Sequence, residues 1–304
     1  MALFYKPGID ILHFHTPMSG IFGIVARLAG VPALMQMHGI DWQRKRWETA
    51  ARFVIRNSER AVMRMMPVCT AVSQTQVEFY EKAYGRRLIM IPTGTLEPNV
   101  SSAHDEIAKI GLTPGKFILF MSRLVPEKDA HFLISAYRHM KTEYKLVIAG
   151  GIVPSDTYTE SLLKLADKDP RIIFPGFVSG ELKNELFSHA ALYAQPSEIE
   201  GLSIAFLEAM SFGLPCLASD IPENIEAIGE YGHTFRSQDT DDLKLQLEEV
   251  LAHREEYAAL GLSARNRVLE EFSWESVTDR LFSLYNLCLS SRGKAFIEAG
   301  SESS

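Results

Sequence analysis

The chain has 304 residues, enough for two domains at about 150 residues each, and its apolar and charged fractions are those of an ordinary soluble protein. Three isolated cysteines give neither a disulfide framework nor a zinc-binding spacing, and neither a signal peptide nor an apolar run of about 18 residues is evident, so we expect a cytoplasmic protein. The net charge of −7 divides into +5 over residues 1–100 and −12 over residues 101–304, which argues against a general nucleic-acid binder and indicates an anionic partner for the first half.

Apolar runs alternate with helical patterns through the first 91 residues. Strands are expected at 9–15, 32–37, 67–72 and 88–91, with helices at about 19–29, 43–65 and 73–84. This alternation predicts an α/β domain with a mainly parallel sheet.

Histidines lie at the ends of the first two expected strands. His38 is followed by Gly39, which would let the backbone approach a ligand closely, so His38 is either part of a binding site or a cap at a strand end. His13 and His15 alternate onto one strand face, as metal ligands would, but a metal site needs a third ligand and none is evident in the sequence.

The helix expected at 43–65 is amphipathic. Its apolar face gathers Trp47, Val54, Ile55, Val62, Met65 and Met66. A slanted stripe on the opposite side consists of Arg52, Arg56, Arg60 and Arg64. This stripe is either a surface for anionic lipid headgroups or the ordinary solvated face of a helix packed on a core.

A polar, turn-rich stretch at 94–115 is the expected connection to a second α/β unit, which opens with a strand at 117–122. Arg123 and Lys128 directly follow that strand. A guanidinium and an ammonium at the carboxyl end of a strand suit a diphosphate, and the alternative is a surface ion pair. Asp239 and Asp241 precede a helical pattern and are interpreted as helix caps rather than metal ligands.

A strand-to-helix loop carries Glu200, and Glu208 lies about two turns into the helix that we expect to begin at Leu202. Eight residues at 1.5 Å each put the two carboxylates roughly 12 Å apart, beyond the about 5–9.5 Å of a glycosidase pair. The helix N-terminus between them can bind an anion, so a sugar, a diphosphate and a ribose in a row would fit. The alternative is a helix cap at Glu200 and a solvated Glu208.

The pattern Ser-x-x-Glu-Gly-Leu-x-x-x-x-Leu-Glu-Ala-Met-x-x-Gly-x-Pro over residues 197–215 resembles the signature of the family 4 retaining glycosyltransferases. The resemblance covers nearly all of residues 9–290, and the loop at 38–44 is similar to that of bacterial rhamnosyltransferase-like enzymes of surface polysaccharide synthesis. It implies an α/β fold of the GT-B type, two Rossmann-like domains around a cleft. It also implies an enzyme that moves a hexose from a nucleotide-diphosphate sugar to a polysaccharide or lipid-linked acceptor, with retention and without a metal ion or cofactor.

The resemblance also implies roles for individual residues. Glu208 would hold the ribose hydroxyls, and Glu200 with His38 would position the sugar. The diphosphate would be held by Arg123, Lys128 and the backbone at Gly201, Leu202 and Ser203, and the nucleobase would touch the backbone at Phe177 and Val178.

The same resemblance sets the expected domain boundaries. They are a partial, acceptor-side domain over 1–100, a nucleotide-sugar-binding domain over 101–272, a helix at 273–290 that crosses back to the first domain, and a disordered tail at 291–304. Relatives begin with two or three more β–α units and a Gly-rich loop that we do not find here, so we expect an incomplete first domain and an N-terminally truncated chain.

Two alternatives to the transferase stay open: a catalytically silent donor-binding protein, and a non-hydrolysing nucleotide-sugar 2-epimerase. The expected partners are a nucleotide-sugar donor, a glycan or lipid-linked acceptor and an anionic membrane that meets the helix at 43–65, with no nucleic acid. The expected location is therefore the cytoplasm, peripheral at the inner face of the membrane.

Overall fold

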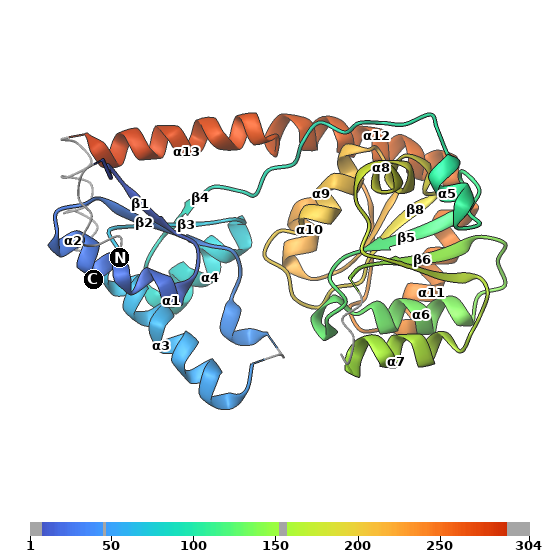
Figure 1. Cartoon of the computed structure of the whole chain (residues 1–304), viewed down its shortest axis with the longest axis horizontal. Coiled ribbons are helices and arrows are strands. Elements are labelled where there is room, and N and C mark those ends of the chain that lie inside the picture. The colour runs from blue at the N-terminus through green and yellow to red at the C-terminus, as the bar shows by residue number, and fades with distance from the viewer. Residues whose placement is uncertain (1–7, 45–46, 152–156, 291–304) are drawn as a thin grey trace. The chain divides into compact units, whose positions relative to one another are not determined.

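The computed structural model describes residues 8–44, 47–151 and 157–290, so the tail expected at 291–304 lies outside the described residues. The chain divides into two compact units, which are described separately below (Figure 1). Met1–Thr93 and Trp274–Ser304 form the first unit, and Gly94–Ser273 form the second.

The described part of the first unit holds a four-stranded parallel sheet in which every strand pairs with the next one along the chain. Its strands are β1 (Leu12–Phe14), β2 (Ala33–Met37), β3 (Val68–Ala71) and β4 (Ile89–Met90). Its helices are α1 (Pro17–Gly20), α2 (Phe22–Leu28), the 3-10 turn η2 (Asp41–Gln43), α3 (Thr49–Met65), α4 (Gln74–Tyr84) and α13 (Trp274–Leu289).

Both faces of the first sheet are covered. Met35 and Met37 of β2 point into a core shared with α3 and α4, whereas Leu34 points to the opposite face. This alternation follows the period of two along a strand. The opposite face is covered by α13, whose Val277 and Leu284 pack with Leu34. A helix from the end of the chain therefore belongs to the core of the first unit.

The long helix of the first unit differs from expectation at its start and on its apolar face. It begins at Thr49 rather than 43, after the separate turn η2. Val54 was expected on the apolar face but is 50% exposed. The reason is that the buried stripe follows positions 55, 58, 59, 62 and 63, and Val54 lies about 100° away from Ile55 around the helix axis.

The described part of the second unit holds a six-stranded parallel sheet with the order β10-β9-β8-β5-β6-β7. Its strands are β5 (Phe117–Met121), β6 (Lys145–Ala149), β7 (Ile172–Gly176), β8 (Leu192–Gln195), β9 (Cys216–Ser219) and β10 (His233–Phe235). Its helices are α5 (Asp105–Lys109), η3 (Pro126–Lys128), α6 (Ala130–Arg138), α7 (Thr157–Ala166), α8 (Gly180–His189), α9 (Ile204–Ser211), α10 (Pro222–Ile228), α11 (Thr240–Ala252) and α12 (Arg254–Glu271).

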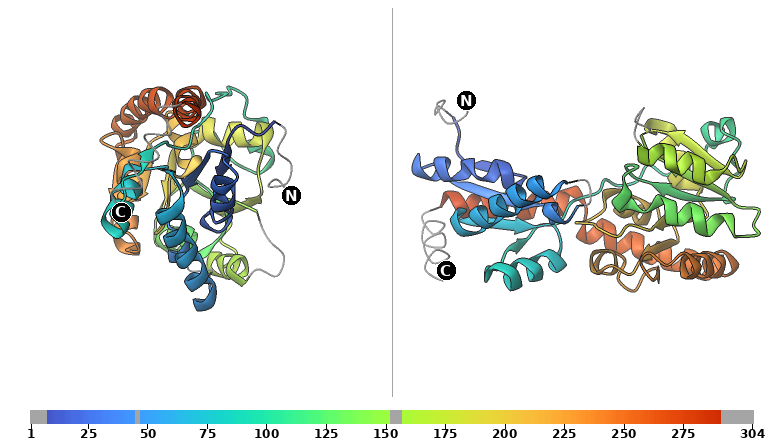
Figure 2. Two further views of the ribbon diagram at one scale, coloured as in Figure 1. Left: turned by 90° about the vertical axis from the view of Figure 1, so that its left-hand side faces the viewer. Right: turned by 90° about the horizontal axis from the view of Figure 1, so that it is seen from below.

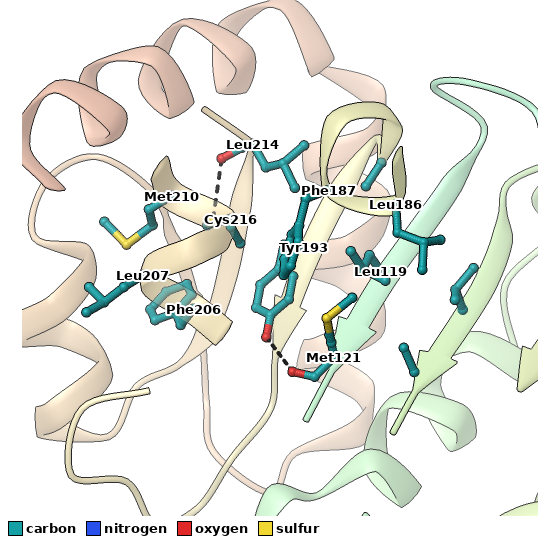
Figure 3. Close-up of a cluster of buried hydrophobic side chains, with 14 of the residues drawn as sticks. Leu119, Met121, Leu186, Phe187, Tyr193, Phe206, Leu207, Met210, Leu214 and Cys216 are labelled. Atoms are coloured by element: carbon teal, nitrogen blue, oxygen red, sulfur yellow. Dashed lines mark hydrogen bonds between the residues drawn. The ribbon is translucent and has the colours of Figure 1, made fainter. Parts of the chain in front are cut away.

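Helices lie on both faces of this second sheet (Figures 1 and 2), and each face has its own apolar core. Tyr193 of β8 belongs to the core shared with α8 and α9 (Figure 3), whereas its neighbours Leu192 and Ala194 belong to the other core. The strand order reverses between β5 and β8. In open α/β sheets, ligands bind at the carboxyl ends of the strands beside such a reversal.

The start of α11 carries a side-chain cap. Asp239 caps α11, and its side chain accepts hydrogen bonds from the amides of Asp241 and Asp242, so the interpretation as a helix cap is confirmed for Asp239; Asp241 lies in the first turn and contributes only its amide. Within the described ranges, we find no helix whose length and apolar character would let it cross a membrane.

Candidate functional site

Polar side chains gather at the carboxyl ends of β5 and β8, where the order of the second sheet reverses. Lys128 follows β5 through η3, and Gln195, Ser197 and Glu200 come from the end of β8 and its loop. All four are buried; Lys128 and Glu200 are each 8% exposed. Buried polar groups are costly unless they are hydrogen-bonded, so their partners define the arrangement.

Glu200 is held by two donors. Lys128 Nζ donates to Glu200 Oε1 in a buried ion pair, and Gln195 Nε2 donates to the same oxygen at 2.6 Å. Gln195 Nε2 also donates to Ser197 Oγ at 2.9 Å. The Tyr193 hydroxyl lies 3.1 Å from Gln195 Oε1 and 3.0 Å from the Met121 carbonyl, the contact drawn in Figure 3. The end of β5, the end of β8 and the Glu200 loop are therefore tied into one network.

The two cations that the sequence placed together have different surroundings. Lys128 is buried and committed to Glu200. Arg123 is exposed, and its guanidinium makes neither an ion pair nor a hydrogen bond with any residue that the structure describes. The donors of Arg123 are therefore free to bind a ligand, whereas those of Lys128 are used to hold Glu200.

The helix after the Glu200 loop begins at Ile204, two residues later than expected. Ser203 is its N-cap, and the Ser203 hydroxyl accepts a hydrogen bond from the amide of Phe206 at 3.4 Å. Gly201 is buried and Leu202 is half-buried in the preceding loop. The first amides of a helix lack intrahelical partners, so this end of α9 retains the capacity to bind an anion.

Glu208 is not simply solvated. Its Oε1 accepts a hydrogen bond from Lys183 Nζ of α8 at 2.6 Å. This ion pair is partly exposed, because the side chain of Glu208 is 25% exposed and that of Lys183 is 32% exposed. The second oxygen of Glu208 has no hydrogen bond to any described residue, so it can accept one from a ligand.

Phe177 and Val178 follow β7, two strands away from β5 at the same carboxyl edge of the parallel sheet. Phe177 is 81% exposed, whereas Val178 is buried. An aromatic ring in solvent next to a site is suited to contact with a planar ligand group. This segment therefore shares the carboxyl edge of the sheet with the Glu200 network but makes no hydrogen bond within it.

Three residues of the site were not foreseen in the sequence. Gln195 and Lys183 hold the two carboxylates described above, and Glu223 of α10 adds a further half-buried carboxyl. Burial raises the pKa of Glu223, and the nearby Glu200 raises it further. Gln195 is the last residue of β8, and its position at a strand end is the one sequence signal that could have identified it.

His38 belongs to the first unit, where it follows β2. The structure brings it to His15, with 3.0 Å between His15 Nδ1 and His38 Nε2, and the ring of His13 lies 4.1 Å from that of His15. His13 Nδ1 is 2.7 Å from the hydroxyl of Tyr285 of α13. Among the residues described, no three His, Cys, Asp or Glu side chains are arranged to hold a metal ion.

Burial, together with the neighbouring His15 and His38, lowers the pKa of His13 to about 4. Burial also lowers the pKa of His38, with His15 as the next contribution. Adjacent imidazoles disfavour one another's charge, so the His13–His15–His38 cluster is poorly suited to a second positive charge near neutral pH.

The loop after His38 is fixed by a carboxylate that the sequence analysis missed. Glu59 of α3 is fully buried and accepts hydrogen bonds from Trp42 Nε1 at 3.2 Å, Tyr84 at 2.7 Å and Tyr80 at 3.2 Å. Burial raises the pKa of Glu59. Because Trp42 lies four residues after His38, this contact anchors the loop that carries the histidine.

Comparison with known families gives a consistent assignment. The profile described as glycosyl transferases group 1 matches residues 103–267, more than half of the chain, and the profile described as glycosyl transferase 4-like domain matches residues 2–94. The chain therefore belongs to the group 1 glycosyl transferase family.

Several curated relatives are enzymes of this kind. The sulfoquinovosyl transferase SQD2 of Arabidopsis thaliana is 25% identical over 303 residues, which cover 91% of this chain and 56% of SQD2. The O-antigen chain mannosyltransferase B of Escherichia coli is 27% identical over 178 residues, 56% of this chain and 46% of that enzyme. The chain spans about half the length of these relatives.

Solved structures confirm the predicted fold. Sucrose-phosphate synthase from Thermosynechococcus elongatus superimposes with a TM-score of 0.80 at 23% identity, over 94% of this chain and 75% of that chain. Anabaena Alr3699/HepE in complex with UDP and glucose superimposes with a TM-score of 0.81 at 19% identity, over 94% of this chain and 79% of that chain. The two parallel-sheet units are therefore the Rossmann-like domains of a GT-B fold.

Proposed function

We propose that this chain binds a nucleotide-diphosphate sugar at the carboxyl edge of the second sheet and transfers its hexose to an acceptor. The observation that carries the proposal is the buried network in which Lys128 and Gln195 fix Glu200, at the sheet edge where Arg123 follows β5 with exposed, unengaged donors. A carboxylate held by two donors is a preorganised group, able to orient sugar hydroxyls without moving itself.

In the proposed arrangement the ligand lies along this edge. Glu200 faces the sugar, Arg123 and the first amides of α9 face the diphosphate, and Glu208 accepts hydrogen bonds from the ribose. As the bond from the sugar to the diphosphate breaks, negative charge grows on the departing diphosphate. The fixed cation and the helix N-terminus stabilise that charge. The acceptor oxygen bonds to the sugar, and the proton of the acceptor hydroxyl passes to the departing diphosphate.

The donor class is supported by the relatives. Structures of Alr3699/HepE hold UDP or UDP-glucose, and a Corynebacterium glutamicum relative, 28% identical over 251 residues (75% of this chain, 64% of that enzyme), is named a GDP-mannose-dependent mannosyltransferase. The full name of that enzyme refers to phosphatidylinositol monomannoside, and the name of mannosyltransferase B refers to an O-antigen chain. We therefore propose a glycan or lipid-linked acceptor.

The finer features of the reaction follow from the family resemblance. We propose transfer with retention, neutralisation of the diphosphate by protein cations rather than a metal ion, and membership of the rhamnosyltransferase-like subgroup on account of the loop at 38–44. We also propose that the chain acts in the cytoplasm, with α3 meeting an anionic membrane through its arginines.

The experiment is to follow nucleotide sugars by NMR in the presence of the chain, with and without a lipid-linked or oligosaccharide acceptor. Release of nucleotide diphosphate that depends on the acceptor, and is lost in Glu200→Gln, supports the proposal. Conversion of the donor to its 2-epimer without an acceptor would show the epimerase instead. Donor binding with neither reaction, for every acceptor tried, would identify a silent binding protein and contradict the transferase.

A further inference from the structure

A pocket of about 650 Å³ opens between α3 and α4 of the first unit. The residues that line it and carry the argument are Arg56, Arg60 and Arg64 of α3, Trp42 of η2, and Phe79 and Tyr84 of α4. All belong to the first unit, so the pocket is separate from the site of the second unit.

The three arginines form one row. Successive members are four residues apart on α3, so their side chains lie one above the other along the helix, and all three are exposed. Like charges at this spacing destabilise a helix. An anion bound between them would relieve that repulsion.

The guanidinium groups have few partners of their own. Arg56 lies over the ring of Trp42, 4.9 Å from its centroid, and Arg60 Nη1 donates to Asn57 Oδ1 at 3.4 Å. In the part of the chain that the structure describes, no carboxylate forms an ion pair with any of the three arginines. Most of their donors therefore face solvent or a ligand.

Two aromatic side chains of the pocket, those of Trp42 and Tyr84, are held by a carboxylate behind them. The Trp42 indole and the Tyr84 hydroxyl both donate to Glu59, which is fully buried behind them. The carboxylate of Glu59 is thus occupied by these donors and does not line the pocket. The pocket presents cations on one side and aromatic faces on the other.

This combination selects the chemistry of the ligand. Guanidinium groups bind phosphate oxygens in bidentate fashion, and three of them exceed what a single carboxylate needs. The volume lies in the range of pockets that hold whole small molecules. There is room for an organic group beside Trp42 and Phe79 in addition to a phosphate.

We propose that the pocket between α3 and α4 binds the phosphate group of an organic phosphate, with its organic part against the aromatic side chains. The phosphate can belong to a soluble ester or to the headgroup of an anionic lipid. This site does not rest on the donor site proposed above. If the phosphate comes from a lipid, the pocket identifies which arginines of α3 meet the membrane.

The test uses the full chain and two probes. Glycerol 3-phosphate is titrated by calorimetry, and co-sedimentation compares vesicles of equal parts phosphatidylcholine and phosphatidylglycerol with vesicles of phosphatidylcholine alone. The variants are Arg60→Gln, which removes a central cation, and Ala83→Trp, which fills the pocket without changing any charge. Ala83 lines the pocket and is exposed, so the larger side chain fits without disturbing the core.

The matched control is Arg52→Gln. Arg52 lies in the same exposed row of α3 but does not line the pocket, and its guanidinium donates to the Arg44 carbonyl at 3.4 Å. We expect Arg60→Gln and Ala83→Trp each to weaken probe binding by about tenfold, and Arg52→Gln by less than about twofold. Circular dichroism and melting temperature confirm that each variant is folded.

The two arms distinguish the source of the phosphate. Loss of glycerol 3-phosphate binding in the pocket variants supports a soluble ester, and the same pattern with phosphatidylglycerol vesicles alone supports a lipid headgroup. Equal loss in Arg52→Gln and Arg60→Gln would show a diffuse basic surface, and binding of neither probe would show no phosphate site; either result overturns the proposal. Nucleotide binding by the same variants is expected to stay unchanged, so this proposal and the donor site succeed or fail separately.

Discussion

Replacing Lys128 by methionine tests whether the ion pair between Lys128 and Glu200 is buried, as it is in the structure. Removing one partner of a buried ion pair costs about 3–5 kcal/mol, because the remaining charge stays buried without compensation. Gln195 would still donate to Glu200 at 2.6 Å, so we expect a loss at the lower end of this range, about 3 kcal/mol of the free energy of unfolding. The double variant Lys128→Met with Glu200→Gln removes both charges, and we expect it to lose only about 1 kcal/mol.

The assay is urea unfolding followed by far-UV circular dichroism, which reports on both units. Tryptophan fluorescence is the internal control, because the three tryptophans, at 42, 47 and 274, all belong to the first unit. We expect Lys128→Met to lower the stability seen by circular dichroism, and the double variant to restore most of it. A loss below about 0.5 kcal/mol in Lys128→Met would mean that the pair behaves like a solvated surface bridge, and would refute the reasoning.

Three further predictions concern the other carboxylates and the histidines. Glu208→Gln should weaken nucleotide-diphosphate binding by about tenfold in calorimetry, since a charge-assisted bond is lost, and an unchanged affinity would remove Glu208 from the site. The folded-state pKa of His13, about 4, lies below its unfolded value, so its contribution to stability is present above about pH 6.5 and is lost as the pH falls toward 4. The free energy of unfolding should therefore fall less between pH 6.5 and pH 4 in His13→Gln than in the wild type, by about 1–2 kcal/mol because the ring is partly solvated. Urea unfolding measured at both pH values checks this, and an equal fall in variant and wild type would contradict it. Tyr84→Phe removes one of the three donors to buried Glu59 and should lower the free energy of unfolding by about 1–2 kcal/mol, read from the tryptophan fluorescence of the first unit; an unchanged midpoint would show that Glu59 is satisfied without it.

The fold was predictable because it depends on patterns that are local in sequence. Alternation of apolar runs with helical periods predicted both parallel sheets, and the spacing of Glu200 and Glu208 predicted a loop residue and a helix residue. Their partners were not predictable. Lys128 lies 72 positions before Glu200, and Lys183 lies 25 positions before Glu208, so only the packed structure brings each pair together.

Glu59 shows the same limit within one helix. In the sequence it lies among the arginines of α3, where a solvated role is the natural interpretation. Its burial depends on Tyr80 and Tyr84 of α4 and on Trp42, which meet it only after the helices pack on the sheet. The turn η2 brings Trp42 against Glu59, and α3 begins only after that turn, which is why the helix starts later than its apolar period indicated.

The most direct test of the central claim is calorimetry of the full chain with UDP, GDP, ADP and TDP, each with and without its sugar. Arg123→Gln is the site variant, and Arg138→Gln, an exposed arginine of α6 paired with Asp167, is the control. A donor site at the carboxyl edge of the second sheet predicts selective binding of one nucleotide diphosphate, weakened by about tenfold in Arg123→Gln and unaffected in Arg138→Gln. Binding of none of the four, or equal binding by both variants, would contradict a donor site at the carboxyl edge of the second sheet.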